Sequence, residues 1–227
     1  MQPKETFLRY VPIFTDLPED ALEKIERIGN RKTYNKDEPI LLEEDSGTAL
    51  FVIISGKVKV SRSSDDGKEV ILTILGESDF FGEMAILDGL ARSANVIAIE
   101  KSDVFVIRRN DFLNLLEDHS EVTITLLQEL TTRLRNADMK IKALSLKDSE
   151  GKVATVLLQI AEYSGIIKSG VVEIEKLPVQ QDLANMAGTS RETISRTLHS
   201  FAKRGLIELD GAKLRILDFG KFKERFE

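Results

Sequence analysis

The chain has 227 residues, of which 42% are hydrophobic and 31% charged, and its formal net charge is −6. This length allows one large hydrophobic core or two smaller ones. The chain contains no cysteine, which excludes disulfides, cysteine-ligated zinc and cysteine-held iron–sulfur clusters. No apolar run approaches the roughly 20 residues of a membrane helix, and the first residues lack the apolar core of a signal peptide. We therefore expect a cytoplasmic protein without a membrane partner.

The acidic charge lies in the first part of the chain. Residues 148–227 contain 12 basic and 12 acidic residues, whereas residues 1–147 contain 20 basic and 26 acidic residues. A C-terminal part that is neutral overall can still present a basic face to nucleic acid. The two histidines, His119 and His199, have no spaced partner, so we expect solvent-exposed side chains and neither a metal nor a haem site.

Residues 5–30 are predicted to be helical, with residues 17–28 as the clearest part. A proline near the first helical position and acids in the first turn favour a helix start here. The spacing places Leu22, Ile25 and Ile28 on one face of this helix.

From residue 31 to residue 108 the pattern changes to short runs rich in Val, Ile, Leu and Phe between Gly, Asp and Ser turns. Such runs are typical of antiparallel strands joined by hairpins. About eight short strands at this spacing predict a small β-barrel or jelly roll. The clearest runs are residues 39–42, 49–54, 57–62, 69–75, 95–99 and 104–107.

A long amphipathic helix is predicted from residue 120 to about residue 146, after a short helical signal over residues 111–116. Its apolar residues recur at three- and four-residue spacing, as in the seam of a coiled coil. We expect this seam to join two copies of the chain in a homodimer; packing against the chain's own barrel is the alternative. The seam residues are Leu127, Leu130, Leu134, Ala137, Ile141 and Leu144.

The C-terminal part begins with a polar break over residues 148–151, which we interpret as a hinge. Residues 178–186 and 191–204, separated by Gly188, have the pattern of a helix–turn–helix. The other predicted elements are a helix over residues 152–163, a strand over 171–174, a two-stranded wing over 206–209 and 213–216, and a terminal helix over 219–226.

The second helix of this pattern carries residue types suited to reading DNA. Ser190 is expected to cap it, which leaves Arg191, Glu192, Ser195 and Arg196 exposed where such helices meet base edges. Arginine can bind guanine O6 and N7, and a carboxylate can accept from cytosine N4. We therefore expect double-stranded DNA as a partner; a helical pair with a solvated face is the alternative. Thr193 belongs to the same segment, and Gln181, Lys203 and Arg204 are candidate phosphate contacts.

Residues 81–96 have the composition of a pocket for a small phosphorylated ligand. Arg92 offers a fork that matches phosphate oxygens, Ser93 offers a hydroxyl and an amide, and Glu83 can accept from a ribose hydroxyl. Gly82 lets the backbone approach the sugar. A buried ion pair between Glu83 and Arg92 that staples the barrel is the alternative. Leu75, Met84, Ile86 and Leu87 form the expected apolar wall, and Ala85 is counted with the same site.

These motifs make the chain resemble the CRP/FNR superfamily of bacterial transcription regulators over nearly its whole length. Residues 188–196 are similar to the family's Gly-x-Ser-Arg-Glu-Thr-Val-x-Arg segment, and residues 81–96 to the phosphate-binding cassette of cyclic-nucleotide domains. The resemblance implies a dimeric regulator controlled by a cyclic nucleotide, with RNA polymerase as a further partner. It also implies a TGTGA-like half-site, with Arg191 and Arg196 on guanines and Glu192 on the opposite strand.

The resemblance leaves the ligand open. In cyclic-AMP-responsive members, a Thr-Ser pair on the long helix meets the adenine, and alignment through Arg133 places Ala137 and Asp138 there. Ala137 offers no hydroxyl, whereas Asp138 can accept from the adenine amine or from two donors of a guanine edge. We count Arg133, Ala137 and Asp138 among the ligand-binding residues. The family favours cyclic AMP; cyclic GMP, cyclic di-GMP or no ligand remain alternatives.

The predicted fold is α+β with three parts. They are a jelly-roll β-barrel sensor domain over residues 1–117, a long dimerisation helix over 118–147 and a winged helix–turn–helix domain over 148–227. The sequence contains no nucleophile elbow, metal triad or Walker loop, so we expect no enzyme. The remaining alternatives are a ligand-independent regulator of the same family and a cyclic-nucleotide module that regulates a protein partner.

Overall fold

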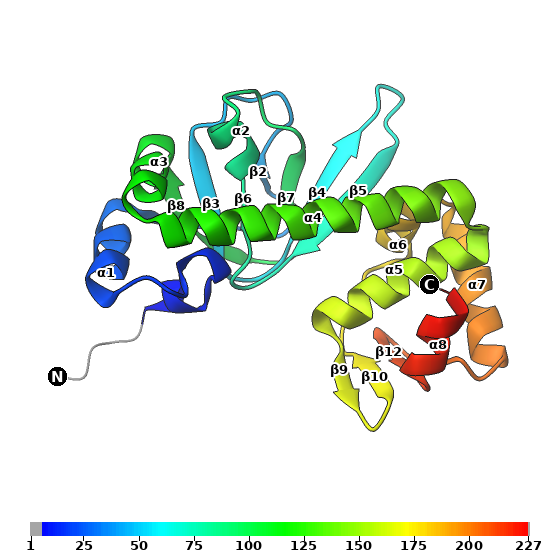
Figure 1. Ribbon diagram of the computed structural model, residues 1–227. Coiled ribbons are helices and arrows are strands. Elements are labelled where there is room, and N and C mark those ends of the chain that lie inside the picture. Colours follow the sequence, from blue (N-terminus) through cyan, green and yellow to red (C-terminus); the bar gives the residue numbers. More distant parts are fainter. Residues whose placement is uncertain (1–5, 227) are drawn as a thin grey trace. The chain divides into compact units, whose positions relative to one another are not determined.

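A computed structural model of the chain describes residues 6–226. The chain divides into two compact units, residues up to Leu134 and residues from Arg135 onward. The division falls inside the long helix α4 (Ser120–Leu146), which is green in Figure 1. The domain boundaries predicted after residues 117 and 147 stay predictions.

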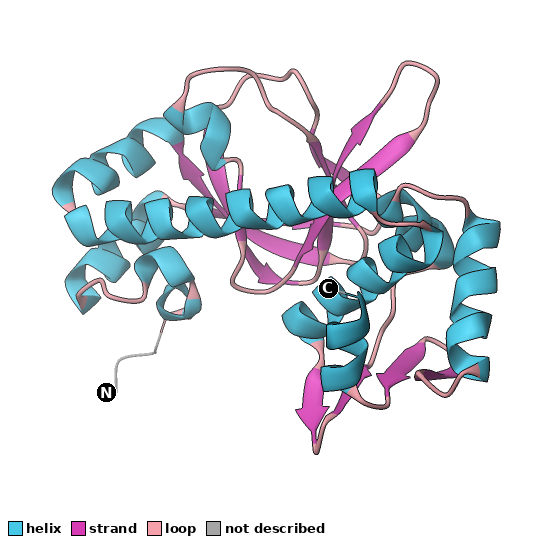
Figure 2. Cartoon of the chain, turned by 45° about the vertical axis from the view of Figure 1, so that its right-hand side comes forward, coloured by secondary structure: helices cyan, strands magenta, loops and turns pink. Residues whose placement is uncertain are grey.

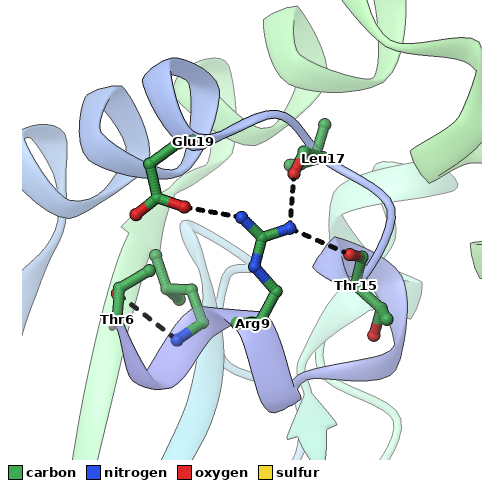
Figure 3. A network of polar contacts seen from close by, with 6 residues as sticks. Thr6, Arg9, Thr15, Leu17 and Glu19 are labelled. Carbon is green, nitrogen blue, oxygen red and sulfur yellow. Dashed lines mark hydrogen bonds and ion pairs between the residues drawn. The ribbon is translucent and has the colours of Figure 1, made fainter. Parts of the chain in front are cut away.

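The N-terminal segment forms two 3-10 helices and one α-helix, and not one continuous helix. Arg9 connects them (Figure 3): its guanidinium donates to the carbonyls of Leu17 (2.8 Å) and Thr15 (3.3 Å) and pairs with Glu19 (2.6 Å). Pro12 begins the second helix and Pro18 is the N-cap of the third, because a proline lacks the amide hydrogen that would continue a preceding helix. Residue 5 of the predicted helical stretch lies outside the described residues. The helices are η1 (Phe7–Tyr10), η2 (Pro12–Phe14) and α1 (Glu19–Ile28).

Two four-stranded antiparallel sheets form the N-terminal barrel, with the strand orders β1-β8-β3-β6 and β2-β7-β4-β5. These orders are those of a jelly roll, so the predicted fold is confirmed. The sequence pattern did not indicate β1, which is polar, or β6, which has two residues. The strands are β1 (Asn30–Tyr34), β2 (Pro39–Leu41), β3 (Ala49–Ser55), β4 (Val58–Ser63), β5 (Glu69–Leu75), β6 (Phe80–Phe81), β7 (Asn95–Ala98) and β8 (Ser102–Arg108).

Two hydrophobic cores share strand β3, whose successive side chains point to opposite sides of the sheet. Leu50 and Val52 belong to a helical core, together with residues of α1, α3 (Arg109–Asp118) and the start of α4. Phe51 and Ile53 belong to a barrel core, together with residues of β4, β5 and β7. The short helix α2 (Glu83–Leu87) follows β6 after one residue, Gly82. Of β6, Phe80 belongs to the helical core and Phe81 to the barrel core, so α2 begins where the two cores meet.

Helix α4 buries its first turns and exposes an apolar stripe further on. Val122 and Leu126 are buried in the helical core, and Leu130 packs against it. Of the predicted seam, Leu130 and Leu144 are half-buried within the chain, whereas Ala137 is exposed. The exposed apolar residues at seven-residue spacing are Leu127 (59%), Leu134 (63%) and Ile141 (63%).

The second unit contains a helix–turn–helix and a four-stranded sheet in the order β11-β12-β10-β9, whose strands are magenta in Figure 2. The predicted break over residues 148–151 is shorter in the structure. Helix α5 already begins at Ser149, because Asp148 caps it by accepting a hydrogen bond from the Gly151 amide (2.8 Å). The elements are α5 (Ser149–Ser164), β9 (Ile166–Lys168), β10 (Val171–Ile174), α6 (Gln180–Ala187), α7 (Arg191–Lys203), β11 (Ile207–Asp210), β12 (Lys213–Ile216) and α8 (Phe219–Phe226).

An aromatic cluster fixes helix α7 to the terminal helix α8. The ring of Phe201 lies 5.6 Å from that of Phe222 and 5.3 Å from that of Phe226. At the C-terminal end of α8, Lys147 donates to the Phe226 carbonyl and to the Thr155 hydroxyl. One side of α7 therefore packs against α8, whereas its other side faces solvent.

Candidate ligand pocket and nucleic-acid interface

The candidate ligand site is built where β6 turns into α2. Gly82 stands at this turn with φ 88°, a conformation that residues with a side chain rarely adopt. A Cβ on Gly82 would lie 2.8 Å from Nη1 of Arg92 and 3.1 Å from the Ala49 carbonyl oxygen. The turn therefore requires glycine both for its backbone conformation and for the close approach of Arg92.

Arg92 is a buried cation, only 5% exposed, that binds backbone oxygens. Its Nη1 donates to the Gly82 carbonyl (2.7 Å) and its Nη2 to the Ala49 carbonyl (2.8 Å). Its Nε is buried and has no hydrogen-bond partner among the described residues. Burial lowers the pKa of the Arg92 guanidinium, and the charges of Glu83 and Asp45 partly offset this effect. The site therefore holds a desolvated positive charge with one unused donor, which suits an anionic ligand.

Glu83, 4% exposed, pairs with Arg133 of α4 and not with Arg92. Arg133 donates from Nη1 to Glu83 Oε1 (3.0 Å) and from Nη2 to the Phe80 carbonyl (2.7 Å). Its guanidinium also lies 4.4 Å from the centre of the Phe80 ring, within cation–π distance. The alternative of a Glu83–Arg92 staple is therefore wrong. The contacts to Phe80 and Ala49 could not be foreseen, because any residue supplies a carbonyl.

The remaining cassette residues divide between the surface and the cores. Ser93 and Met84 are exposed, and the Ser93 hydroxyl lies 3.6 Å from the Met84 sulfur. Ala85 is buried. Leu75 belongs to the barrel core and Ile86 to the helical core, and their place in the pocket wall stays a prediction.

Ala137 and Asp138 lie on α4 beyond the division between the two units, and both are exposed. Arg133 precedes the division and is the predicted residue of α4 that the first unit brings to the cassette. The structure therefore gathers Gly82, Glu83, Arg92 and Arg133 in one place.

The helix–turn–helix has the geometry that its sequence indicates. Gly188 ends α6 in the left-handed conformation (φ 57°). The Ser190 hydroxyl caps α7 by accepting from the Thr193 amide (3.2 Å) and also contacts the Thr193 hydroxyl (3.1 Å). The predicted core residues of the two helices are all buried: Leu183, Met186, Ile194, Leu198 and Phe201.

The outer side of α7 presents charged side chains near its N-terminus. Arg191, Glu192 and Arg196 are exposed, whereas Ser195 is half-buried. Hydrogen bonds from its own amide and from Ser190 lower the pKa of the Glu192 carboxyl, with a further contribution from the charge of Arg191. Glu192 is therefore held as an ionised acceptor, the form that can bind a cytosine amino group.

Two other predicted DNA contacts are engaged with neighbouring side chains. Gln181, on the exposed side of α6, donates to Asn185 Oδ1 (3.0 Å). Arg204 pairs with Glu150 of α5 (2.7 Å). Lys203, the last residue of α7, is exposed. A phosphate contact from Arg204 would therefore compete with its pair to Glu150.

The described part of the chain offers neither a metal cluster nor a membrane-spanning helix. Within residues 6–226, no three His, Asp or Glu side chains are grouped closely enough to hold a metal ion. In the same part of the chain, no helix combines the length and apolar character needed to cross a membrane.

Comparison with known proteins identifies the family. The profile of the cyclic nucleotide-binding domain matches residues 31–119, and that of the Crp-like helix-turn-helix domain matches residues 151–225. The chain is 32% identical over 213 residues to the CRP-like cAMP-activated global transcriptional regulator of Mycobacterium tuberculosis, covering 94% of this chain and 95% of that protein. Identity and coverage are the same for the cyclic AMP receptor protein of Thermus thermophilus.

A solved structure supports the fold. FixK2 from Bradyrhizobium japonicum superposes with a TM-score of 0.77 at 21% identity, covering 87% of this chain and 96% of that one. The two profiles and the relatives named as regulators agree with the resemblance that the motifs indicate. The chain therefore belongs to the CRP/FNR family of transcriptional regulators, which are not enzymes.

Proposed function

We propose that the barrel of this regulator binds a cyclic nucleotide and thereby controls the binding of a homodimer to double-stranded DNA. The observation that carries the first part is Arg92, a buried guanidinium with one unused donor. Arg92 forms no ion pair within 4 Å among the described residues, so the cost of its lost hydration is only partly offset. A phosphate would supply the missing negative charge and acceptor.

The surrounding residues match the other parts of such a ligand. Ser93 is exposed beside Arg92 and can donate its hydroxyl to the phosphate. Glu83 uses only Oε1 for Arg133, so that Oε2 can accept from a ribose hydroxyl. Met84 and Ala85, which follow on α2, are assigned to the same site, and Gly82 allows the backbone to approach the sugar.

The base is assigned to α4, through Ala137 and Asp138. The relatives from Mycobacterium tuberculosis and Thermus thermophilus are named for cyclic AMP, which favours that ligand. Asp138 can accept one hydrogen bond from adenine or two from a guanine edge, so cyclic GMP and cyclic di-GMP are the competing ligands.

Isothermal titration calorimetry with cyclic AMP, cyclic GMP and cyclic di-GMP tests the site and the ligand together. We expect micromolar or tighter binding of one of them. Arg92→Gln should abolish it, whereas Arg62→Gln, which alters an arginine that pairs with Glu43 on the surface, should bind like the wild type. No heat with any nucleotide would favour the ligand-independent regulator.

DNA binding is assigned to the outer side of α7. Arg191 and Arg196 are proposed to bind guanines, and Glu192 a cytosine amino group, in a TGTGA-like half-site. The exposure of these three side chains and the ionised state of Glu192 support this assignment. Thr193 and Ser190 contribute at the helix start, and RNA polymerase is the proposed partner of the DNA-bound dimer.

Gel-shift titration with a palindromic TGTGA probe and a scrambled probe tests the DNA assignment. Arg191→Ala should weaken binding to the palindrome by about 1–3 kcal/mol and relax the preference at one base pair. Arg225→Ala, at an exposed arginine of α8, is the matched control and should leave both affinities unchanged. Equal binding of wild-type protein to both probes would contradict base reading by α7.

The homodimer is assigned to the apolar stripe of α4. Leu127, Leu134 and Ile141 are each about three-fifths exposed, an arrangement that a lone chain leaves in water and that a second α4 would bury. Leu134→Lys should convert the dimer to a monomer in analytical ultracentrifugation. Asn136→Lys adds the same charge at an exposed site two residues away and should stay dimeric; a wild-type monomer would contradict the assignment.

A further inference from the structure

The outer side of α7 carries an imidazole that the proposed base contacts do not use. His199 is exposed, three residues after Arg196 and four after Ser195. At about 3.6 residues per turn, His199 lies around the helix axis between Arg191 and Arg196, in the middle of the solvent-facing side. Lys203, also exposed, continues this side one turn further. The outer side of α7 is therefore cationic beyond the turn that would read bases.

A hydrogen bond within the helix fixes the imidazole ring. Nδ1 of His199 lies 2.8 Å from the Ser195 carbonyl oxygen. Because a carbonyl oxygen only accepts, Nδ1 must carry the hydrogen, which leaves Nε2 as the second nitrogen of the ring. In the neutral ring Nε2 is an acceptor; in the protonated ring it is a donor with a positive charge.

The chemistry of Nε2 determines what this group can bind. A phosphate oxygen offers only acceptor sites, so a neutral His199 cannot hydrogen-bond to it, whereas a protonated one can form a charge-assisted bond. Recognition helices read bases with their N-terminal residues, and later residues lie nearer the DNA backbone. We propose that His199 is a further DNA-binding residue that contacts a backbone phosphate in its protonated form.

The charged side chains nearest to His199 along α7 are cations. Arg196 lies three residues before His199 and Lys203 four residues after it, whereas the acid Glu192 lies seven residues, or about two turns, before it. The elements packed against α7 carry further acids, which are Glu150 and Glu162 of α5, Asp182 of α6, Glu208 and Asp210 of β11, and Glu224 of α8. Glu150 of α5 is bound by Arg204, and Glu162 of α5 is bound by Lys223 of α8. A phosphate beside His199 would add a negative charge between Arg196 and Lys203, so DNA binding through this contact should take up a proton.

This inference rests on the proposed DNA binding by α7, and the chain offers a matched control because it contains only two histidines. Fluorescence anisotropy with the palindromic probe, from about pH 5.5 to about pH 7.5, covers the range in which an imidazole changes its charge. The proteins are wild type, His199→Gln, His119→Gln and His199→Lys. Circular dichroism checks that each variant is folded.

The wild type should bind roughly tenfold more tightly at the acidic end, because each half-site gains one charge-assisted contact. Its dependence on salt should also become steeper there, by about 0.9 in log–log slope for each half-site. His119→Gln should behave like the wild type, and His199→Gln should lose the pH dependence. His199→Lys should bind tightly at both ends of the range.

Three results would overturn the inference. The first is a wild-type affinity that does not change with pH, and the second is a pH dependence that persists in His199→Gln. The third is tighter wild-type binding at the alkaline end, since tighter binding there would indicate a neutral Nε2 that accepts from a base. Failure of the wild type to prefer the palindrome at any pH would overturn the proposed function as well. A preserved preference with a flat profile would remove His199 alone.

Discussion

Replacing Lys140 with methionine should stabilise the protein. Lys140 is half-buried on α4 within the second unit, and burial lowers the pKa of its amine from 10.5 to about 8. Below pH 8 the folded and unfolded chains both carry the proton, so the folded state bears the net cost that burial imposes on the ammonium group. The residues around it are mainly apolar or uncharged: Ala143, Leu144, Thr155, Val156, Gln159, Met186 and Ala187, with Lys152.

The pKa sets an upper limit for this cost. The interval between about 8 and 10.5 corresponds to about 3–4 kcal/mol, at roughly 1.4 kcal/mol per pH unit. Methionine keeps the apolar stem and removes the charge. Because Lys140 is only half-buried and retains contact with water, we expect Lys140→Met to raise the free energy of unfolding at pH 7 by about 1–2 kcal/mol.

The gain should disappear in alkali. Between pH 8 and pH 10.5 the unfolded chain keeps the Lys140 proton that the folded chain has lost, so the wild type gains stability with rising pH relative to the variant. Urea unfolding at pH 7 and at about pH 10, at one protein concentration, measures both values. Lys142→Met, at an exposed site on the same helix, should stay within about 0.5 kcal/mol of the wild type. A variant that is less stable at pH 7, or a gain that is constant with pH, would refute this reasoning.

Two further changes test local geometry. Gly82→Ala should lower the free energy of unfolding by about 1–3 kcal/mol, because it combines a strained φ with a contact against Arg92. Gly67→Ala shares the strained φ (78°) but its Cβ meets open space, so it should lower the stability less. Thermal denaturation of both variants measures the difference. Ser190→Ala should cost about 1 kcal/mol in urea unfolding because it removes the bond to the Thr193 amide, and Ser190→Gly should cost only a few tenths.

The sequence predicted elements well where a local signal is strong. The bounds of α4, β10, β12 and α8 agree with the prediction to the residue, since a long amphipathic period, alternating apolar residues or an adjoining turn marks each of them. The sequence pattern does not indicate three of the strands. β1 is largely polar, and β6 and β9 have two and three residues, so that pairing with other strands defines them and not their own composition.

The candidate site was predictable in residue type but not in pairing. A Glu83–Arg92 ion pair is the alternative that the sequence allows, but Glu83 pairs with Arg133, 50 positions away, and only the fold brings these two together. The break predicted over residues 148–151 is shorter in the structure for a related reason. The polar side chain of Asp148 is typical of a loop, but it is also a favourable helix cap and lets α5 begin at the next residue.

The pair between Arg133 and Glu83 bears on how a bound ligand would act on α4. Arg133 occupies only Oε1, so a ribose hydroxyl can bind Oε2 without displacing it. The pair would then position Glu83 before the ligand arrives, which lowers the entropy lost on binding. Because Arg133 is part of α4, any change in the charge distribution on Glu83 alters the strength of a contact on that helix. A ligand that acted in this way would shift the balance between states only by its difference in affinity for them, and it would not need to break the contact between Arg133 and Glu83.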